Sequence, residues 1–452
     1  MADLIFAPIQ YLDGDALPQM SRLAGFVLDE AARQGATDSK VGVSCSDDFQ
    51  VDVRGGRVDT LQHTRSESVE ITVWSGLRSA SAHTTGFSAP AIKAAIESAL
   101  LMARYTAEDP FAALASREML AVQHPELDLF HPGAFAPEAV VDLALACEAG
   151  ALAVSGAIDV DGASRGVSRN LAVHANSQGF MGRIIGSGYS ASCVALAREG
   201  DDAQLGHSFN VSRLPDGLMD PHLLGAQAAR KAMARLGAKG LATQRLPVLM
   251  TPEMAARLLS EFMGAITGTS QYTGNSFLRG ALGERIFPEW FNLDERPHLL
   301  QALGSRAFDG DGLPTAAKYF VRNGVLESYS MGLYAARKLG LKSTGNAGGT
   351  SNLFVSPGAI SHSQLLGQMH RGLLVTEMMG HGANPLTGDY SMGVSGFWVD
   401  WGEVQYPVQG ITLAGNLRDI FSGIVAIAMD GNLQYGLDCG SMLIDSLSIA
   451  GH

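Results

Sequence analysis

Residues 371–421 read RGLLVTEMMGHGANPLTGDYSMGVSGFWVDWGEVQYPVQGITLAGNLRDIF, a stretch with nine glycines between short apolar runs. Glycine adopts the positive φ angles of tight turns without steric cost, so this spacing is typical of short strands joined by turns. The run GFWVDWGEVQYPV predicts a hairpin turning at Trp401-Gly402, and Asn416 is a predicted N-cap for a short helix over LRDIFSGI. The stretch therefore predicts a β-rich C-terminal half.

Strand and helix patterns extend this prediction to the rest of the chain. Period-two alternation over residues 40–85, with glycines at 55–56 and 76, predicts a β-meander, and residues 157–213 also have strand patterns. Helices are predicted at about 17–34, after Ser88, at 140–153, at 221–236, and from Thr251 to about Ile266. In the last of these, Pro252 and Glu253 follow Thr251 as a first-turn proline and acid.

The predicted fold class is α+β with two domains. An N-terminal α+β domain over 1–236 has helices packed on an antiparallel β-meander, with subdomains at about 1–115 and 116–236. A β-rich, sandwich- or barrel-like domain with a few helices follows over 246–452. The small-residue and basic segment 237–245 is the predicted linker.

Composition excludes several function classes. Among 452 residues there are 32 Lys and Arg against 45 Asp and Glu, a formal charge of −13 without a basic run, which disfavours nucleic-acid binding. The sequence has neither a signal-peptide pattern nor an apolar run long enough for a membrane-spanning helix. Four separated cysteines without a C-x-x-C pair favour neither a disulfide framework nor a zinc ribbon. The cytoplasm is the expected compartment.

Short motifs give little evidence of chemistry by themselves. Residues 186–191 fit G-x-G-x-x-A, but the surrounding strand pattern disfavours a nucleotide loop. Residues 345–349 are glycine-rich without a following Lys-Ser/Thr, so a tight turn is expected there. Glu377 and His381 are four residues apart in a strand-and-turn context that would separate them, and His362 and His370 are interpreted as packed or solvated side chains.

The order of blocks in the opening stretch gives a more specific indication. GLLVTE-x-MG, TGDYS-x-G, SGFWV, GE-x-QYPV and AGNL-x-D follow one another as in the PmbA/TldE branch of the TldD/PmbA (modulator of DNA gyrase) metallopeptidase family. ARKLGLKSTGNAGG at 336–349, FDGDGLPT at 308–315 and CGSMLIDSLSIAG at the C-terminus are also similar to family segments. The resemblance is strongest over about 240–452.

The resemblance implies a two-subunit peptidase in which a TldD-like subunit holds zinc through H-E-x-x-x-H and a later cysteine. At the matching helix, Ser260 and Ala265 occupy the two histidine positions, while Glu261 and Gly264 are retained. Cys439 matches the third-ligand position as a candidate ligand, although a buried structural cysteine is the favoured interpretation. Catalytic zinc requires about three protein ligands, so no metal site and no catalytic residue are expected in this chain.

The resulting hypothesis is a PmbA/TldE-like subunit of a cytoplasmic zinc metallopeptidase that cleaves unfolded or modified peptides, with zinc on a TldD-like partner in a heterodimer. A homodimer of the chain alone is left open. One alternative is an autonomous metallopeptidase using a non-standard set such as Glu377, His381 and Cys439. The other is a non-catalytic peptide-binding scaffold. Substrate-binding residues are not identified from the sequence.

Overall fold

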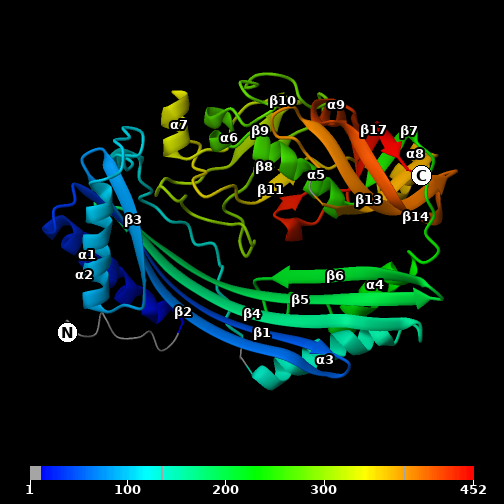
Figure 1. Ribbon diagram of the computed structural model, residues 1–452, viewed down its shortest axis with the longest axis horizontal. Helices are drawn as coiled ribbons and strands as arrows, with labels where there is room; N and C mark the ends of the chain where they lie inside the picture. Colours follow the sequence, from blue (N-terminus) through cyan, green and yellow to red (C-terminus); the bar gives the residue numbers. More distant parts are fainter. Residues whose placement is uncertain (1–11, 134–135, 381, 452) are drawn as a thin grey trace.

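A long antiparallel sheet forms the N-terminal half of the protein. The computed structural model describes residues 12–133, 136–380 and 382–451. The sheet has the order β3-β2-β1-β4-β5-β6, and four of its strands are unusually long. Their bounds are β1 (Asp38–Arg54), β2 (Arg57–Ser75), β3 (Arg78–Thr85), β4 (Ile158–Asn176), β5 (Met181–Glu199) and β6 (Asp202–Ser212). Figure 1 shows this sheet curving beneath the C-terminal half.

Two pairs of helices cover opposite ends of one face of this sheet, here called its outer face (Figure 1). At one end, α1 (Leu17–Arg33) and α2 (Ala89–Ala103) pack on apolar side chains such as Val43 of β1 and Ile71 of β2. At the other end, α3 (Pro137–Leu152) and α4 (Pro221–Met233) cover Val51 and the alanines of β5. Each end therefore has its own apolar core.

The opposite, inner face of the sheet carries small and polar side chains. Ser44, Ser46, Asp48 and Gln50 alternate along β1 with the buried residues of the outer face. Hydroxyl groups bond across neighbouring strands, as between Ser44 and Ser68 at 2.9 Å. The period-two pattern of the sequence thus separates an apolar outer face from a polar inner face.

A closed barrel lies in the C-terminal half. Its sheet has the order β14-β13-β12-β7-β17-β15, and an additional pairing of β14 with β17 closes a five-stranded ring. β7 pairs with β12 in parallel and with β17 in antiparallel orientation. The strand bounds are β7 (Gln244–Met250), β12 (Gly372–Met379), β13 (Asp389–Asp400), β14 (Glu403–Asn416), β15 (Ile424–Ile427) and β17 (Met442–Ala450).

A smaller sheet and five α-helices complete the described part of this half. The sheet has the order β10-β9-β8-β11-β16, with β8 (Leu293–Glu295), β9 (Lys318–Arg322), β10 (Val325–Leu326), β11 (Leu353–Val355) and β16 (Leu437–Asp438). The helices are α5 (Pro252–Ala265), α6 (Gly268–Thr273), α7 (Leu333–Leu339), α8 (His362–Met369) and α9 (Leu417–Ser422). Helix α5 contributes Leu258 and Phe262 to the main core of this half.

The predicted α+β class is confirmed, with a barrel in the C-terminal half. Gly55 and Gly56 have the positive φ angles of 62° and 72° that the predicted hairpin turn requires. Asn416 caps α9 as predicted, since its side chain accepts from the Arg418 N–H at 3.1 Å. Residues 186–191 lie within β5, so no helix follows them as a nucleotide loop would need. The predicted domain division within 237–245 stays a prediction.

Over the residues described, no helix is long and apolar enough to cross a membrane.

Candidate functional site

Helix α5 carries the positions at which the sequence analysis expects lost metal ligands. Thr251 precedes the helix in extended conformation and Pro252 occupies its first turn, as the sequence predicts, although the Thr251 side chain makes no capping bond. The helix is α-helical up to Ala265 and ends at Ile266. The rewound π-type turn that an active H-E-x-x-x-H motif would need is therefore not the conformation of this segment.

The two positions that the resemblance matches to histidines point in different directions. Ser260 is exposed and donates to the Arg257 carbonyl of its own helix at 2.6 Å. Ala265 is buried in the main C-terminal core, with 6% of its surface exposed. Five residues along an ideal α-helix correspond to a rotation of about 140° between the two side chains. One outward hydroxyl and one buried methyl group supply no pair of zinc ligands, so this helix does not fit the metal.

The retained glutamate of the motif lies near the end of β12. Arg257, one turn before Glu261, donates to the carbonyls of Met378 and Gly380 at 2.6 Å each. Burial, together with the charge of Glu261, raises the pKa of the Tyr390 hydroxyl well above its ordinary value. This side of α5 therefore joins helix to strand and keeps Tyr390 in its neutral form.

Cys439, the candidate third ligand, lies directly after β16, which packs against α5. Its side chain is 1% exposed, and the thiol donates to the Gly440 carbonyl at 3.3 Å. Burial raises the pKa of the thiol, and the nearby charges of Asp438 and Asp430 raise it further. A zinc ligand must be the thiolate, whereas this environment favours the neutral thiol.

Two residues of the alternative set, Glu377 and Cys439, lie in the described part of the chain. Glu377 lies in β12 and forms an ion pair with Arg235, which follows α4. His381 lies outside the described residues. Within 12–133, 136–380 and 382–451, no three His, Cys, Asp or Glu side chains are grouped as metal ligands would be. The proposal of an autonomous metal site therefore gains no support from these residues.

A serine-centred cluster, which the sequence reasoning missed, lies next to Cys439. Ser441 is fully buried, and its hydroxyl lies 2.7 Å from Asp430 Oδ2 and 2.8 Å from His362 Nδ1. The Ser441 N–H also donates to Asp430 Oδ1 at 2.7 Å. In a catalytic triad the histidine lies between serine and carboxylate, whereas here the serine lies between the other two. The cluster joins α8 to the segments around β16 and has the arrangement of a structural bridge.

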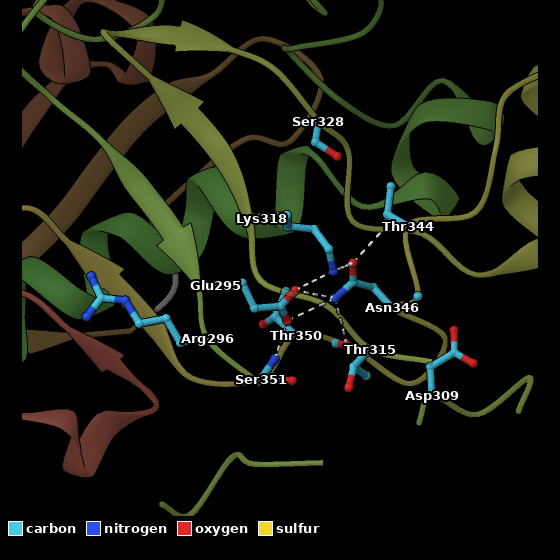
Figure 2. Close-up of polar contacts among 12 residues, drawn as sticks. Glu295, Arg296, Asp309, Thr315, Lys318, Ser328, Thr344, Asn346, Thr350 and Ser351 are labelled. Atoms are coloured by element: carbon cyan, nitrogen blue, oxygen red, sulfur yellow. Dashed lines mark hydrogen bonds and ion pairs between the residues drawn. The ribbon is translucent and has the colours of Figure 1, made fainter. Parts of the chain in front are cut away.

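Another missed feature is a buried carboxylate in the small sheet (Figure 2). Glu295 at the end of β8 is 1% exposed and forms an ion pair with Lys318 of β9 at 2.6 Å. Asn346 Nδ2 donates to the same carboxylate at 3.0 Å, and the Ser351 N–H donates at 2.5 Å. Figure 2 shows Lys318 and Asn346 converging on Glu295 while Arg296 points away. The glycine-rich segment 345–349 is thus an ordered loop fixed by Asn346, in place of a phosphate loop.

The loop beside this network reaches the inner face of the N-terminal sheet. Asp309 is 3% exposed and accepts from the N–H groups of Leu313 and Ala347 at 3.0 Å each. Burial raises the pKa of the Asp309 carboxyl, and these backbone bonds oppose that rise. Phe308 packs edge-on against Phe180 with the ring centres 5.0 Å apart. The two halves of the chain are therefore in direct contact here.

Two hollows lie between the halves. One of about 660 Å³ is lined by residues 124–130, part of β5 and residues 305–308, and includes Arg183 and Arg306. The other, of about 370 Å³, lies over the inner face, where Ser168, Gly188 and Ser190 line it together with Leu303 of the C-terminal half. Both are large enough for several side chains and combine apolar with polar walls.

The structure is an α+β protein in which polar hollows lie between a long sheet and a barrel. Comparison with known proteins identifies the class. Sequence models of PmbA/TldA metallopeptidases match domain 1 at residues 42–103, the central domain at 130–236, and the C-terminal domain at 243–451. The chain is 38% identical to metalloprotease PmbA of Escherichia coli O157:H7 over 423 residues, 93% of this chain and 94% of that one. The chain belongs to this metallopeptidase family, the TldD/PmbA family that its sequence resembles.

Solved structures of similar proteins agree with this assignment. A proposed modulator of DNA gyrase from Bacteroides thetaiotaomicron superposes with a TM-score of 0.92 and 26% identity, over 98% of this chain and 100% of that one. TldE from Thermococcus kodakarensis shares the fold, with a TM-score of 0.83 and 21% identity, over 96% of this chain and 100% of that one. The two-part architecture is therefore common to the family.

Proposed function

We propose that this chain is the metal-free subunit of a cytoplasmic two-subunit zinc metallopeptidase, with a TldD-like partner supplying the metal. The main support for the proposal is that helix α5 has no pair of side chains able to bind zinc at the two matched positions. Ser260 faces solvent and Ala265 faces the core, so the helix offers neither the chemistry nor the geometry of a zinc site. A metal-activated water is the nucleophile of a zinc peptidase, so we expect peptide hydrolysis to depend on the partner's metal.

The role of such a subunit would be to hold the peptide. The inner face of the long sheet supports this role, because hydroxyl and small side chains such as Ser168 and Ser190 line a hollow of about 370 Å³ there. A surface of this kind offers hydrogen bonds to a peptide backbone without strong selection for its side chains. We therefore propose unfolded or modified peptides of varied sequence as the substrate class.

The deciding experiment is metal analysis and peptidase assay of the chain purified alone and together with a TldD-like partner. The proposal expects neither zinc nor activity in the chain alone, and both in the complex. Stoichiometric zinc in the chain alone, lost in Cys439→Ala or His381→Ala, would overturn it in favour of an autonomous enzyme. Full activity of the partner without this chain would favour a scaffold that has no part in proteolysis.

The peptide-holding role has its own test in the reconstituted complex. Ser168→Trp places a large ring in the inner-face hollow and is expected to lower peptide turnover, mainly by raising KM. Ser98→Trp on the exposed side of α2 is the matched control and should leave turnover unchanged. Equal turnover for both variants would contradict the proposal that the inner face of the sheet holds the peptide.

A further inference from the structure

Two cysteines that the proposed function does not use meet in the core at one end of the long sheet. Cys147 of α3 and Cys193 of β5 belong to the apolar core that α3 and α4 form against the sheet (Figure 1). Both are free thiols, with 1% and 0% of their surfaces exposed. The Cys193 thiol donates a hydrogen bond to the Cys147 sulfur. The fold therefore makes neighbours of two thiols that are distant in the sequence.

A second donor reaches the Cys147 sulfur from helix α4. The backbone N–H of Gly225 hydrogen-bonds to this sulfur. Glycine is required at the contact, because a Cβ atom at position 225 would lie only 1.9 Å from the Cys147 carbonyl oxygen. The two helices thus pack closely at Cys147, and its sulfur accepts hydrogen bonds from two different elements.

A buried arginine supplies a positive charge beside the same sulfur. Arg165 of β4 is 7% exposed and lies two residues from Ala163, which is directly opposite Cys193 in the sheet. Alternate residues of a strand share a face, so Arg165 projects into the core that holds both cysteines. Burial lowers the pKa of the Arg165 guanidinium, and the charge that opposes this effect is that of the Cys147 thiolate.

The carboxylate next to Cys147 in the sequence has another partner. Glu148 is 3% exposed and accepts from the N–H of Gly56, in the turn between β1 and β2, at 2.9 Å. The charge that opposes the burial of Arg165 is therefore that of a sulfur in place of a carboxylate. A buried cation is costly unless an anion compensates it, so this arrangement favours the thiolate form of Cys147.

The four cysteines of the chain consequently differ in their protonation. The hydrogen bond from Cys193 lowers the pKa of the Cys147 thiol, and the charge of Arg165 lowers it further, against the opposing effect of burial. The same bond raises the pKa of Cys193, which keeps its proton. Burial raises the pKa of Cys45 to about 12 and also raises that of Cys439. Cys147 alone among them is therefore prepared to act as a nucleophile.

We propose that Cys147 and Cys193 form a peroxide-sensitive dithiol, in which Cys147 is the nucleophile and Cys193 the resolving thiol. The Cys147 thiolate attacks one oxygen of a hydroperoxide and the O–O bond breaks. The other oxygen leaves as alkoxide, or as hydroxide from hydrogen peroxide, and takes a proton from water. The Cys193 thiol then attacks the resulting sulfenic acid, so that an S–S bond forms and water leaves with the thiol proton. Two electrons pass from the two sulfur atoms to the peroxide.

This inference does not rest on the proposed peptidase role. Hydrogen peroxide is small and uncharged, so local opening of the α3–α4 pair admits it to the core. The disulfide would then link α3 covalently to β5, across the contact that both residues already share.

The test uses the full-length chain, treated at pH 7 with a small excess of hydrogen peroxide, then unfolded and alkylated. Non-reducing peptide mass spectrometry should find a disulfide between Cys147 and Cys193 that dithiothreitol reverses, whereas Cys45 and Cys439 should be alkylated. Free thiols at both 147 and 193, or a disulfide that includes Cys45 or Cys439, would overturn the proposal.

Single variants separate the two roles. Cys193→Ser should stop the reaction at a sulfenic acid on Cys147, which dimedone labels. Cys147→Ser should leave Cys193 unlabelled, because the remaining thiol keeps its proton. Cys45→Ser changes a buried cysteine in the other core of the sheet and is the matched control, which should form the disulfide as the wild-type chain does. Dimedone labelling of Cys193 in place of Cys147 would overturn the assignment.

The charge of Arg165 has a test of its own. Arg165→Met should slow disulfide formation about threefold to tenfold, because the lost thiolate is offset only in part by the greater nucleophilicity of a more basic sulfur. Arg165→Lys keeps the charge and should retain most of the rate. Arg169→Met removes an arginine of the same strand that donates to the Gly133 carbonyl at 3.1 Å, and should leave the rate unchanged. Equal rates in all three variants would overturn the proposed activation of Cys147.

A measurement on the wild-type chain covers variants that fail to fold. Because the native chain already holds Cys147 as thiolate near neutral pH, the rate of its oxidation should rise less steeply between pH 7 and pH 9 than in the chain unfolded in urea. Equal slopes in the two states would overturn the inference.

Discussion

Glu295 and the end of helix α5 lie in the same half of the protein, but the polarity of their buried side chains differs. Around Glu295, a lysine, an amide and a backbone N–H converge on one carboxylate in the interior. At α5, the two positions that match metal ligands hold a hydroxyl turned to its own helix and a methyl group in the core. The interior around Glu295 therefore holds a buried ion pair, whereas the positions of Ser260 and Ala265 hold no buried charge.

The difference shows that buried charge and catalytic chemistry are separable in this fold. A buried ion pair is retained only where its polar atoms find partners, because desolvation otherwise costs several kcal/mol. The Glu295 network fixes the loop over 345–349 and so supports the architecture that the family shares. Helix α5 supports the same architecture through its packing in the core and through the Arg257 hydrogen bonds to the Met378 and Gly380 carbonyls.

Removing the buried carboxylate should be the most damaging change. Glu295→Ala leaves Lys318 without its counter-charge in the interior, so the free energy of unfolding should fall by about 3–5 kcal/mol. Glu284→Ala removes the exposed partner of Arg418 and should cost at most about 1 kcal/mol. Urea denaturation of both variants measures the two effects. Equal losses would mean that Glu295 contributes no more than a surface ion pair.

Restoring histidines to α5 should damage the core without creating a metal site. Ala265→His introduces a large polar ring at a buried position and should cost about 1–3 kcal/mol of stability. Ser260→His at the exposed position should stay within about 0.5 kcal/mol of wild type. The double variant should bind zinc no more tightly than the wild-type chain in a competitive chelator titration. Tight binding would show that the helix can rewind to bring the two positions together.

Cys439 should behave as a packed apolar group. Because burial raises the pKa of its thiol, it should not react with a disulfide reagent in the native chain at pH 8 and should react after unfolding in urea. Cys439→Ala should cost about 1 kcal/mol through lost packing. Rapid labelling of the native chain that disappears in this variant would contradict the assignment and revive Cys439 as a ligand.

The smallest effect is expected at Glu30 of α1, a carboxylate that also accepts several bonds. Hydrogen bonds from Arg33 and Gln34 lower the pKa of Glu30 from 4.5 to about 2. A lowered pKa in the folded state stabilises the protein above the unfolded value, and this contribution disappears as pH falls from 4.5 towards 2. Glu30→Gln should therefore lower the melting temperature slightly at pH 7 and converge with wild type near pH 2.

Asp29→Asn, one residue away and exposed, is the control for the Glu30 prediction. It removes a charge from the same helix without removing those bonds. A Glu30→Gln difference that persists unchanged down to pH 2 would mean that the charge of Glu30 is not what stabilises α1.

Local sequence patterns were sufficient to predict many of the turns, strands and helices of the fold. Gly55 and Gly56 predict the β1–β2 turn, and Asn416 predicts the start of α9, because each acts on its immediate neighbours in the chain. The motif comparison at Ser260 and Ala265 rests on the family resemblance, aligned on Glu261 and Gly264 a few positions away. Such features depend on residues a few positions apart, which a single sequence displays directly.

The polar clusters were beyond sequence reasoning because their members are distant in the chain. Glu295 and Asn346 are 51 residues apart, and His362 and Ser441 are 79 apart. Each is an isolated polar residue without a recognisable motif, and only the fold brings it to its partners. The domain division within 237–245 and the role of His381 remain predictions.

The pairing of β7 with β17 has a consequence for how the chain is made. β7 begins at Gln244, whereas its antiparallel neighbour β17 ends at Ala450, the next-to-last described residue. A ribosome therefore releases the first barrel strand long before the last one exists, and ring closure must wait for β17. Contacts so distant along the chain fold slowly and leave strand edges exposed meanwhile. Loss of β17 would leave the barrel open, because the pairing of β17 with β14 closes the ring.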